Sequence, residues 1–317
     1  MPFGTEKNIL FGAAGSGSSG GQTAVFAGTY YYPTNSDVMD WVTISSAGDA
    51  SDFGDDVSSR YEGAGTDNGV NARGISAGGY STVSPASSDE ISYITITSAG
   101  NAIDFGDIST ARYQFGATSN GTNERGIFYG NAASISAIDY ITISSAGNSA
   151  DFGDVYSSIS MRGSGCSNGT NERGVFAAGF RVGPATVFID YITISSLGDA
   201  ADFGDLTVGR STVSGMSNGT SDRGVFAGGG SSDVIDYITI SSLGDAADFG
   251  DCVNSGSGQQ RGGTDSATDN IGVYGGGYST ATKTIETITI SSAGNATHFG
   301  DRTVTGSGSR AMANSKS

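Results

Sequence analysis

Short runs of hydrophobic residues alternate with glycine-rich turns along most of the chain, and this pattern recurs with nearly the same residues. The clearest copy covers residues 222–251, DRGVFAGGGSSDVIDYITISSLGDAADFGD. Runs of Val, Ile, Phe and Tyr bounded by Gly, Asn, Asp and Ser predict short β-strands. Each copy contains four candidate strands: a short strand before an Asn-Gly pair, Gly-Val/Ile-Phe-Ala-Gly-Gly, Ile-Asp-Tyr-Ile-Thr-Ile-Ser-Ser, and a strand carrying Asp-Phe-Gly-Asp.

The last of these strands sets the period of the repeat. Its Asp-Phe-Gly-Asp signature, DFGD below, ends five copies, and a sixth copy has His298 in place of the first Asp. Its phenylalanines lie 46 to 52 residues apart, at Phe53, Phe105, Phe152, Phe203, Phe249 and Phe299. A period near 50 residues with four antiparallel strands is typical of a propeller blade. The sequence therefore predicts an all-β, six-bladed β-propeller, with these phenylalanines filling the space between blades.

Asn-Gly pairs join the first and second candidate strands, at Asn68, Asn120, Asn168 and Asn218. Both residues accept the positive φ angles of a type I′ turn, so we expect a tight hairpin at each pair. Asn120, Asn168 and Asn218 also fall in N-x-T sequons, but the hairpin already explains these residues.

The two ends of the chain predict how the ring closes. Residues 1–22 match no repeat, and we assign them as an arm or linker that docks the protein, with residues 23–317 as the propeller. Met312 and Asn314 follow Asp301 at the distances at which Met216 and Asn218 follow Asp205. The C-terminus thus supplies a first strand without a second, whereas Thr23–Gly28 is a second strand without a first. We expect the two to pair in one blade, which removes two exposed sheet edges.

Composition narrows the possible partners. The net charge is −17 with a pI near 4.1, so nucleic acid is excluded as a partner, because phosphate binding needs a concentrated basic surface. No apolar run approaches 18 residues and no signal sequence is recognisable, so we expect neither a membrane span nor routine secretion. Cys166 and Cys252 occupy unrelated repeat positions, which gives no support for a disulfide framework.

Arginine recurs at fixed places in the repeat. Arg60, Arg112 and Arg210 each follow the last Asp of DFGD by five residues. We expect these arginines to be structural, either paired with a repeated Asp between blades or bonded to the backbone. The carboxylates that flank the Phe of DFGD are expected to accept turn amides or to pair with such an arginine.

Candidate chemistry is sparse. Six DFGD copies without the other kinase motifs exclude a kinase magnesium site. His298 has no second histidine with which to anchor zinc, and no GxSxG turn precedes a helix. Asp-rich turns offer oxygen ligands for calcium, but none matches a calcium-binding loop. We expect no metal, no cofactor and no enzymatic activity.

The alternation of an arginine, a strand ending in Gly-Gly and an aromatic-bearing strand resembles the kelch repeat over almost the whole chain, although the aromatic role usually held by tryptophan falls here to the Phe of DFGD. The wording IDYITISS…GNAxDFGDLT…R…RGVFAGG more specifically resembles repeats of virion structural proteins and tail or capsid appendages of marine bacteriophages. This resemblance implies a kelch-like propeller on a virus particle released by lysis, a homo-oligomer in contact with other virion proteins.

We therefore expect a non-enzymatic virion protein of the tail-fibre or capsid-fibre type, which attaches to a host-cell glycan or protein or contacts its neighbours in the particle. The alternatives are a purely structural decoration or nozzle subunit, and a carbohydrate-active enzyme on a propeller scaffold. Loops between the second and third strands vary most, and variable loops on a regular scaffold often bind ligands. Their aromatic residues are the candidate contacts: Tyr30, Tyr31, Tyr32, Tyr80, Phe180, Phe188 and Tyr278.

Overall fold

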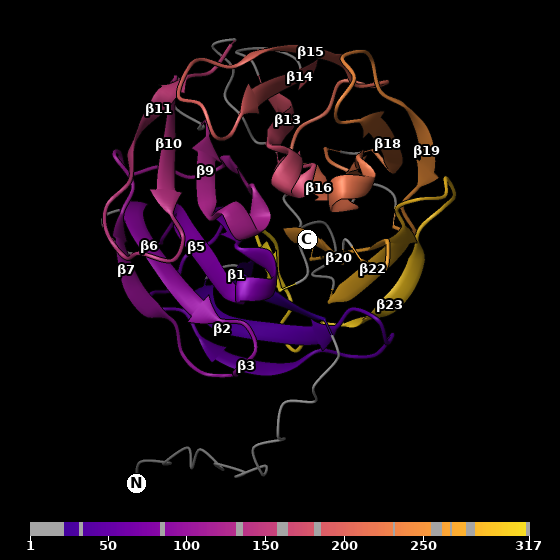
Figure 1. The fold of residues 1–317 in the computed structure, drawn as a ribbon. Helices are drawn as coiled ribbons and strands as arrows, with labels where there is room; N and C mark the ends of the chain where they lie inside the picture. Colours follow the sequence, from indigo (N-terminus) through magenta and orange to yellow (C-terminus); the bar gives the residue numbers. More distant parts are fainter. Residues whose placement is uncertain are drawn as a thin grey trace, which may run out of the picture.

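A computed structural model places 24 strands in six four-stranded sheets. It describes residues 22–31, 34–82, 86–130, 136–156, 164–180, 185–230, 232–254, 262–266, 268–276 and 283–314. The six sheets stand around a central axis, and Figure 1 shows them as a closed ring. The predicted six-bladed β-propeller is confirmed. The assignment of residues 1–22 as an arm lies almost wholly outside the described residues.

Each blade is one antiparallel sheet, whose strands are named from the innermost to the outermost. Blade A contains β24 (Arg310–Ala313), β1 (Thr23–Tyr31), β2 (Thr34–Thr43) and β3 (Ser51–Asp55). Blade B contains β4 (Ala64–Asp67), β5 (Arg73–Tyr80), β6 (Ser87–Thr95) and β7 (Ile103–Asp107). Blade C contains β8 (Gly116–Ser119), β9 (Arg125–Tyr129), β10 (Ala137–Thr142) and β11 (Ala150–Asp154).

The other three blades repeat this order. Blade D contains β12 (Ser164–Ser167), β13 (Arg173–Phe180), β14 (Ala185–Thr193) and β15 (Ala201–Asp205). Blade E contains β16 (Ser214–Ser217), β17 (Arg223–Ala227), β18 (Val234–Thr239) and β19 (Ala247–Asp251). Blade F contains β20 (Gly262–Ser266), β21 (Ile271–Gly275), β22 (Thr284–Thr289) and β23 (Thr297–Asp301).

Blade A joins the two ends of the chain, as the sequence predicts. Strand β24 pairs antiparallel with β1, with Val25 opposite Met312 and Phe26 opposite Ala311. The innermost strands then follow one another around the axis, and β24 lies between β20 and β4. No sheet edge is left open at the closure, which is the outcome that natural β-proteins favour because an unpaired edge invites aggregation.

The Asn-Gly pairs do not form the expected type I′ turns. Asn68 has φ −107°, whereas a type I′ turn needs a positive φ at both central residues. The chain instead makes one 3-10 turn, η1 (Gly69–Asn71), before β5 begins at Arg73. The Asn68 side chain accepts a hydrogen bond from the backbone N–H of Arg73, at 2.7 Å, and so closes a wider loop. Three further blades repeat this turn as η2 (Gly121–Asn123), η3 (Gly169–Asn171) and η4 (Gly219–Ser221).

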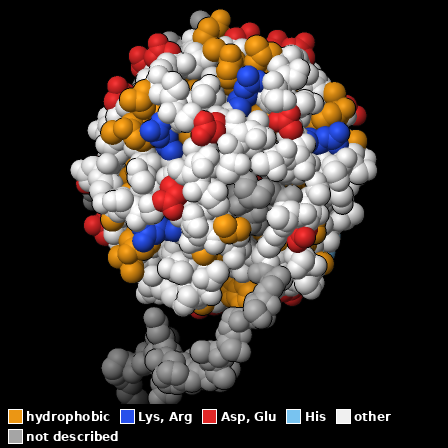
Figure 2. All heavy atoms as spheres, viewed as in Figure 1, with side chains coloured by type: hydrophobic (Ala, Val, Ile, Leu, Met, Phe, Trp, Pro, Cys, Tyr) orange, Lys and Arg blue, Asp and Glu red, His pale blue; other side chains and the backbone are white. Residues whose placement is uncertain are grey.

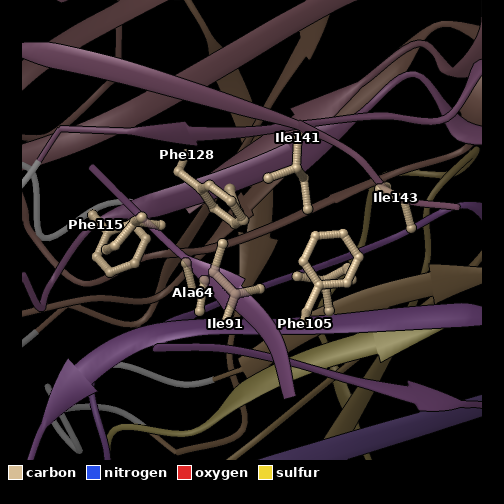
Figure 3. Close-up of a cluster of buried hydrophobic side chains, with 11 residues drawn as sticks. Ala64, Ile91, Phe105, Phe115, Phe128, Ile141 and Ile143 are labelled. Atoms are coloured by element: carbon tan, nitrogen blue, oxygen red, sulfur yellow. The ribbon is translucent and has the colours of Figure 1, made fainter. Parts of the chain in front are cut away.

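The DFGD phenylalanines lie between blades, where the sequence placed them. Phe105 at the end of blade B packs with Ile141 and Ile143 of blade C, and Figure 3 shows these side chains in one cluster with Phe115 and Phe128. All six phenylalanines are at most 5% exposed. Because burial of such a ring contributes about 1.5 to 3 kcal/mol, six of them make the gaps between blades a major part of the core.

A turn of the next blade completes each of these junctions. The backbone N–H of Asp107, the last residue of one DFGD copy, donates to the side-chain oxygen of Asn148 in the Gly-Asn turn of blade C, at 3.1 Å. Gly106 has φ +145°, and a Cβ there would come within 2.5 Å of the Gly147 carbonyl oxygen. Corresponding Asn or Asp side chains accept the same bond at 2.9 to 3.1 Å in the five other junctions, namely Asn101, Asp199, Asp245, Asn295 and Asp49.

Candidate binding face

The two ends of the ring differ in what they expose. Connections from first to second strands and from third to fourth strands lie at one end, which we name the turn face and which Figure 1 views with its helical turns around the axis. Connections from second to third strands and the linkers between blades lie at the other end, which we name the loop face. None of the helices in the described part of the chain is long and apolar enough to cross a membrane.

Arginines on the turn face hold neighbouring blades together. The Arg73 guanidinium lies 4.4 Å from the ring centroid of Tyr93 and donates to the carbonyl oxygen of Ile143 in blade C, at 3.0 Å. The same pair of contacts is made by Arg125, Arg173 and Arg223. Figure 2 shows isolated cationic side chains around this face, each beside hydrophobic ones. The guanidinium groups of these arginines are therefore engaged in contacts between blades.

The polar side chains of a shallow groove on the turn face, between blades D and E, are also engaged in contacts within the protein. Its lining includes Asn168, Arg173, Asp222 and Ser241. Asn168 donates to the Asp222 carboxylate at 3.1 Å, and the backbone N–H of Ser241 does so at the same distance. The polar groups of this groove thus satisfy one another.

The linker arginines Arg112 and Arg210 are buried, and each pairs with an aspartate that recurs in the repeat, as expected. Arg112 pairs with Asp139 at 2.7 Å and Arg210 pairs with Asp236 at 2.9 Å. Both aspartates belong to third strands, whereas the DFGD carboxylates, such as that of Asp104, are exposed. The alternative in which a DFGD carboxylate pairs with such an arginine is therefore wrong, because the DFGD strand is outermost and the arginine side chain points into the blade. Burial lowers the pKa of Arg112 and of Arg210, and the partner carboxylates oppose that shift.

A larger charged cluster lies where the ring closes. The Asp56 carboxylate contacts Arg60 at 3.5 Å, also contacts Arg310 of β24, and accepts a hydrogen bond from the Ser92 hydroxyl at 2.5 Å. Burial alone would raise the pKa of Asp56, but the two guanidinium charges and these hydrogen bonds outweigh it and hold that pKa well below its usual range. The cluster joins blades A and B and is closed to solvent.

The central channel offers little room. Small residues of the innermost strands, among them Gly65, Ala117, Ser164 and Gly263, line two cavities along it, of about 30 and 20 Å3. Such volumes hold a few water molecules at most. These two cavities, lined by described residues of the innermost strands, are therefore water-sized.

Four tyrosines gather on the loop face across blades A and B, and we name them the tyrosine row. Tyr30 stacks on Tyr61 with centroids 4.6 Å apart and an interplanar angle of 17°. Tyr80 meets Tyr61 edge to face at 5.6 Å and Tyr113 at 5.1 Å. All four rings are half-buried and thus partly open to solvent. The structure brings the candidates Tyr30 and Tyr80 together and adds two residues that the sequence analysis missed.

Both additional tyrosines carry a sequence signal. Tyr61 and Tyr113 directly follow the buried arginines Arg60 and Arg112. Successive side chains of an extended segment point to opposite sides. An arginine directed into the blade therefore directs the next residue outward, and an Arg-Tyr pair in a linker predicts a surface tyrosine.

Backbone hydrogen bonds fix the row in place. Tyr61 and Tyr80 exchange two N–H···O bonds of 3.0 and 2.7 Å, and Tyr30 and Ser307 exchange two of 2.9 and 3.1 Å. Glu62 and Gln114 lie beside the row with positive φ angles of 56° and 58°. Such angles are unusual for residues with a side chain and persist only where the surrounding structure imposes them.

The polar side chains beside the tyrosine row are a carboxylate and a neutral amide. The Gln114 amide donates to the Glu62 carboxylate at 2.8 Å. Burial, with the negative charge of Glu62 and the neighbouring phenols, raises the pKa of Tyr61 above its usual range. The Tyr61 hydroxyl therefore stays protonated throughout the physiological pH range.

The remaining candidate contacts are dispersed. Phe188 is exposed on β14 in blade D. Tyr31 and Phe180 are the last residues of β1 and β13, at the loop face. Tyr32 and Tyr278 lie outside the described residues.

The described residues contain no group of three or more His, Cys, Asp and Glu side chains that could hold a metal ion. His298 lies exposed on β23, opposite Glu286 of β22. Cys166 and Cys252 are buried and are not joined in a disulfide. No protein-family model matches the chain, and no curated protein matches it significantly.

Proposed function

We propose that the protein is a non-enzymatic component of a bacteriophage particle, a propeller whose loop face attaches the particle to a host-cell surface. The tyrosine row carries this proposal. It is the place on the described surface where partly exposed aromatic rings meet one another, and exposed apolar clusters of this kind mark interaction sites.

The contrast between the two faces supports a display role. On the turn face, arginine, asparagine and aspartate side chains are used in contacts between blades. On the loop face, blades A, B and D carry second strands of eight or nine residues, whereas those of blades C, E and F have five. Uniform junctions combined with blade-specific loops are typical of a scaffold that presents a binding surface.

The two water-sized cavities along the channel support a non-enzymatic role, because neither could enclose a substrate at the axis. Placement on a phage particle rests on the resemblance of the repeats to virion proteins.

Two measurements test the proposal. Immunogold labelling of purified particles of the encoding phage should decorate an appendage or the capsid surface, and soluble propeller should bind cells of the host bacterium and compete with the particle for adsorption. Absence of label from the particle would refute the virion role. Labelled particles together with no cell binding and a loop face buried against other particle proteins would support a purely structural subunit instead.

A further inference from the structure

We infer that the tyrosine row binds a neutral polysaccharide, which lies along Tyr30, Tyr61, Tyr80 and Tyr113. This inference rests on the proposed attachment function and names its ligand class. It concerns a surface row that runs across the junction of blades A and B, separate from the channel and from the groove on the turn face.

The arrangement of the rings fits a saccharide. The planes of Tyr61 and Tyr80 are inclined by 67° and those of Tyr80 and Tyr113 by 70°. Tyr80 is therefore turned relative to both of its neighbours, whereas Tyr30 stacks on Tyr61, so the row combines ring faces with hydroxyl-bearing edges. A sugar ring offers the complementary surface, an apolar C–H side that packs on an aromatic face and hydroxyl groups that pair with polar edges.

The polar groups beside the rings favour a ligand rich in hydroxyl groups. The Glu62 carboxylate, half-buried next to Tyr61, is an acceptor for hydroxyl donors. The side-chain oxygen of Gln114, a residue only 5% exposed, has no hydrogen-bond partner within the described part of the protein.

Charge argues for a neutral ligand. The chain carries a net charge of −17. The arginines next to the row, Arg60 and Arg112, are buried in pairs with Asp56 and Asp139, and Lys283 in blade F is the one lysine within the described ranges. An anionic polymer would meet repulsion with no cation of the row to offset it.

The row is rigid before any ligand binds. Paired backbone bonds hold Tyr61 against Tyr80 and Tyr30 against Ser307, and three successive ring contacts limit side-chain rotation. Little conformational entropy is therefore lost on binding, so a row of half-buried rings can bind a flexible polymer despite its small area.

The test uses the full-length protein on a glycan array divided into neutral, sulfated, uronate-containing and sialylated members, with a proline-rich peptide as a further probe. We expect binding to one or more neutral glycans. Tyr61→Ala and Tyr113→Ala should each weaken it by about tenfold or more, and Tyr61→Phe should weaken it less because the ring is kept. Tyr156→Ala is the matched control, since Tyr156 is 60% exposed in a linker but lies outside the row.

Tyr113 is the terminal ring of the row, so Tyr113→Ala keeps the test valid if Tyr61→Ala unfolds the protein; melting curves establish which variants are folded. Failure of every neutral glycan to bind, binding of anionic glycans or the peptide alone, or equal affinity of the row variants and Tyr156→Ala would each overturn the inference. Cell binding by the same preparations separates the two proposals: adsorption that survives in the row variants keeps the attachment function and refutes the ligand site.

Discussion

Arg310, in the last strand of the chain, forms a buried ion pair with Asp56, a residue 254 positions earlier. The pair ties the C-terminal strand to blade B as well as to its own blade A, because Asp56 also contacts Arg60 and the Ser92 hydroxyl. Closure of the ring thus combines backbone pairing with a charged cluster that solvent does not reach.

Replacing Arg310 by methionine should destabilise the protein by roughly 3 kcal/mol, because removing one partner leaves a carboxylate buried without its full complement of charge. The value lies at the low end of the range for such changes, since Arg60 still faces Asp56. Urea unfolding measures the loss. Lys283→Met is the control, because that exposed ammonium contacts only the Thr303 carbonyl among its described partners, and its loss should cost less than about 1 kcal/mol. Equal effects of the two changes would contradict a role for Asp56 in closure.

Deleting residues 310–317 removes β24 and leaves the inner edge of β1 unpaired. The protein should melt at a much lower temperature and aggregate, since an open strand edge pairs with other chains. Melting curves and size-exclusion chromatography report both effects. Deleting only residues 315–317 keeps β24 and should leave the melting temperature nearly unchanged. An intact melting curve for the longer deletion would show that the shared blade does not stabilise the ring.

Gly106→Ala tests the junction between blades B and C. The new Cβ would approach the Gly147 carbonyl oxygen to 2.5 Å, in a backbone conformation that itself costs roughly 1 to 3 kcal/mol for a residue with a side chain. We expect a loss of stability of at least that size in urea unfolding. Gly100→Ala is the control, because a Cβ there meets no atom within 4 Å and its φ angle is ordinary. A junction that tolerates both substitutions equally would refute close contact between DFGD and the next turn.

Asp190 should make stability depend on pH. Burial raises its pKa to about 6, although the hydrogen bond from the Tyr129 hydroxyl opposes the shift. A carboxyl group with a raised folded pKa binds its proton more tightly when folded, so its favourable contribution is complete below pH 4 and is lost as pH rises from about 4 to 6. Asp190→Asn should flatten the stability profile in this window.

Asp236→Asn provides the contrast, because Asp236 occupies the equivalent strand position but pairs with Arg210. This change should destabilise the protein at pH 7, by leaving a guanidinium buried without its partner. A profile for Asp190→Asn that keeps the wild-type slope between pH 4 and 6 would exclude Asp190 as its source.

The fold could be predicted from the sequence because the sequence repeats. A strand pattern that returns every 46 to 52 residues, and a partial unit at each end, were enough to predict blade number, strand order and the pairing of residues 311–314 with Thr23–Gly28. The same repetition explains the placement of the phenylalanines, since a large apolar side chain at one repeat position must be buried in every blade.

The features that the sequence does not predict depend on the direction in which a side chain points and on contacts between residues far apart in the chain. Arg112 could pair with any nearby aspartate, and only the geometry of the blade turns it toward Asp139 of a third strand. The Asn-Gly turns were misjudged because side-chain capping by Asn68 favours a longer loop over a two-residue hairpin. Tyr61 and Tyr113 lie in linkers outside the repeated strands, so the strand pattern does not point to them, although they supply half of the tyrosine row.

The amide of Asp301 donates to the Asp49 side chain in the same way as each other DFGD strand contacts the blade that follows it. Each unit that ends in DFGD and joins its third and fourth strands through Gly-Asx carries both halves of this contact. Recombination between repeats would exchange whole blades, and with them the loops they display, while this hydrogen bond between neighbouring blades is kept. Such exchange would change the loops that the protein displays while keeping a contact that stabilises the ring.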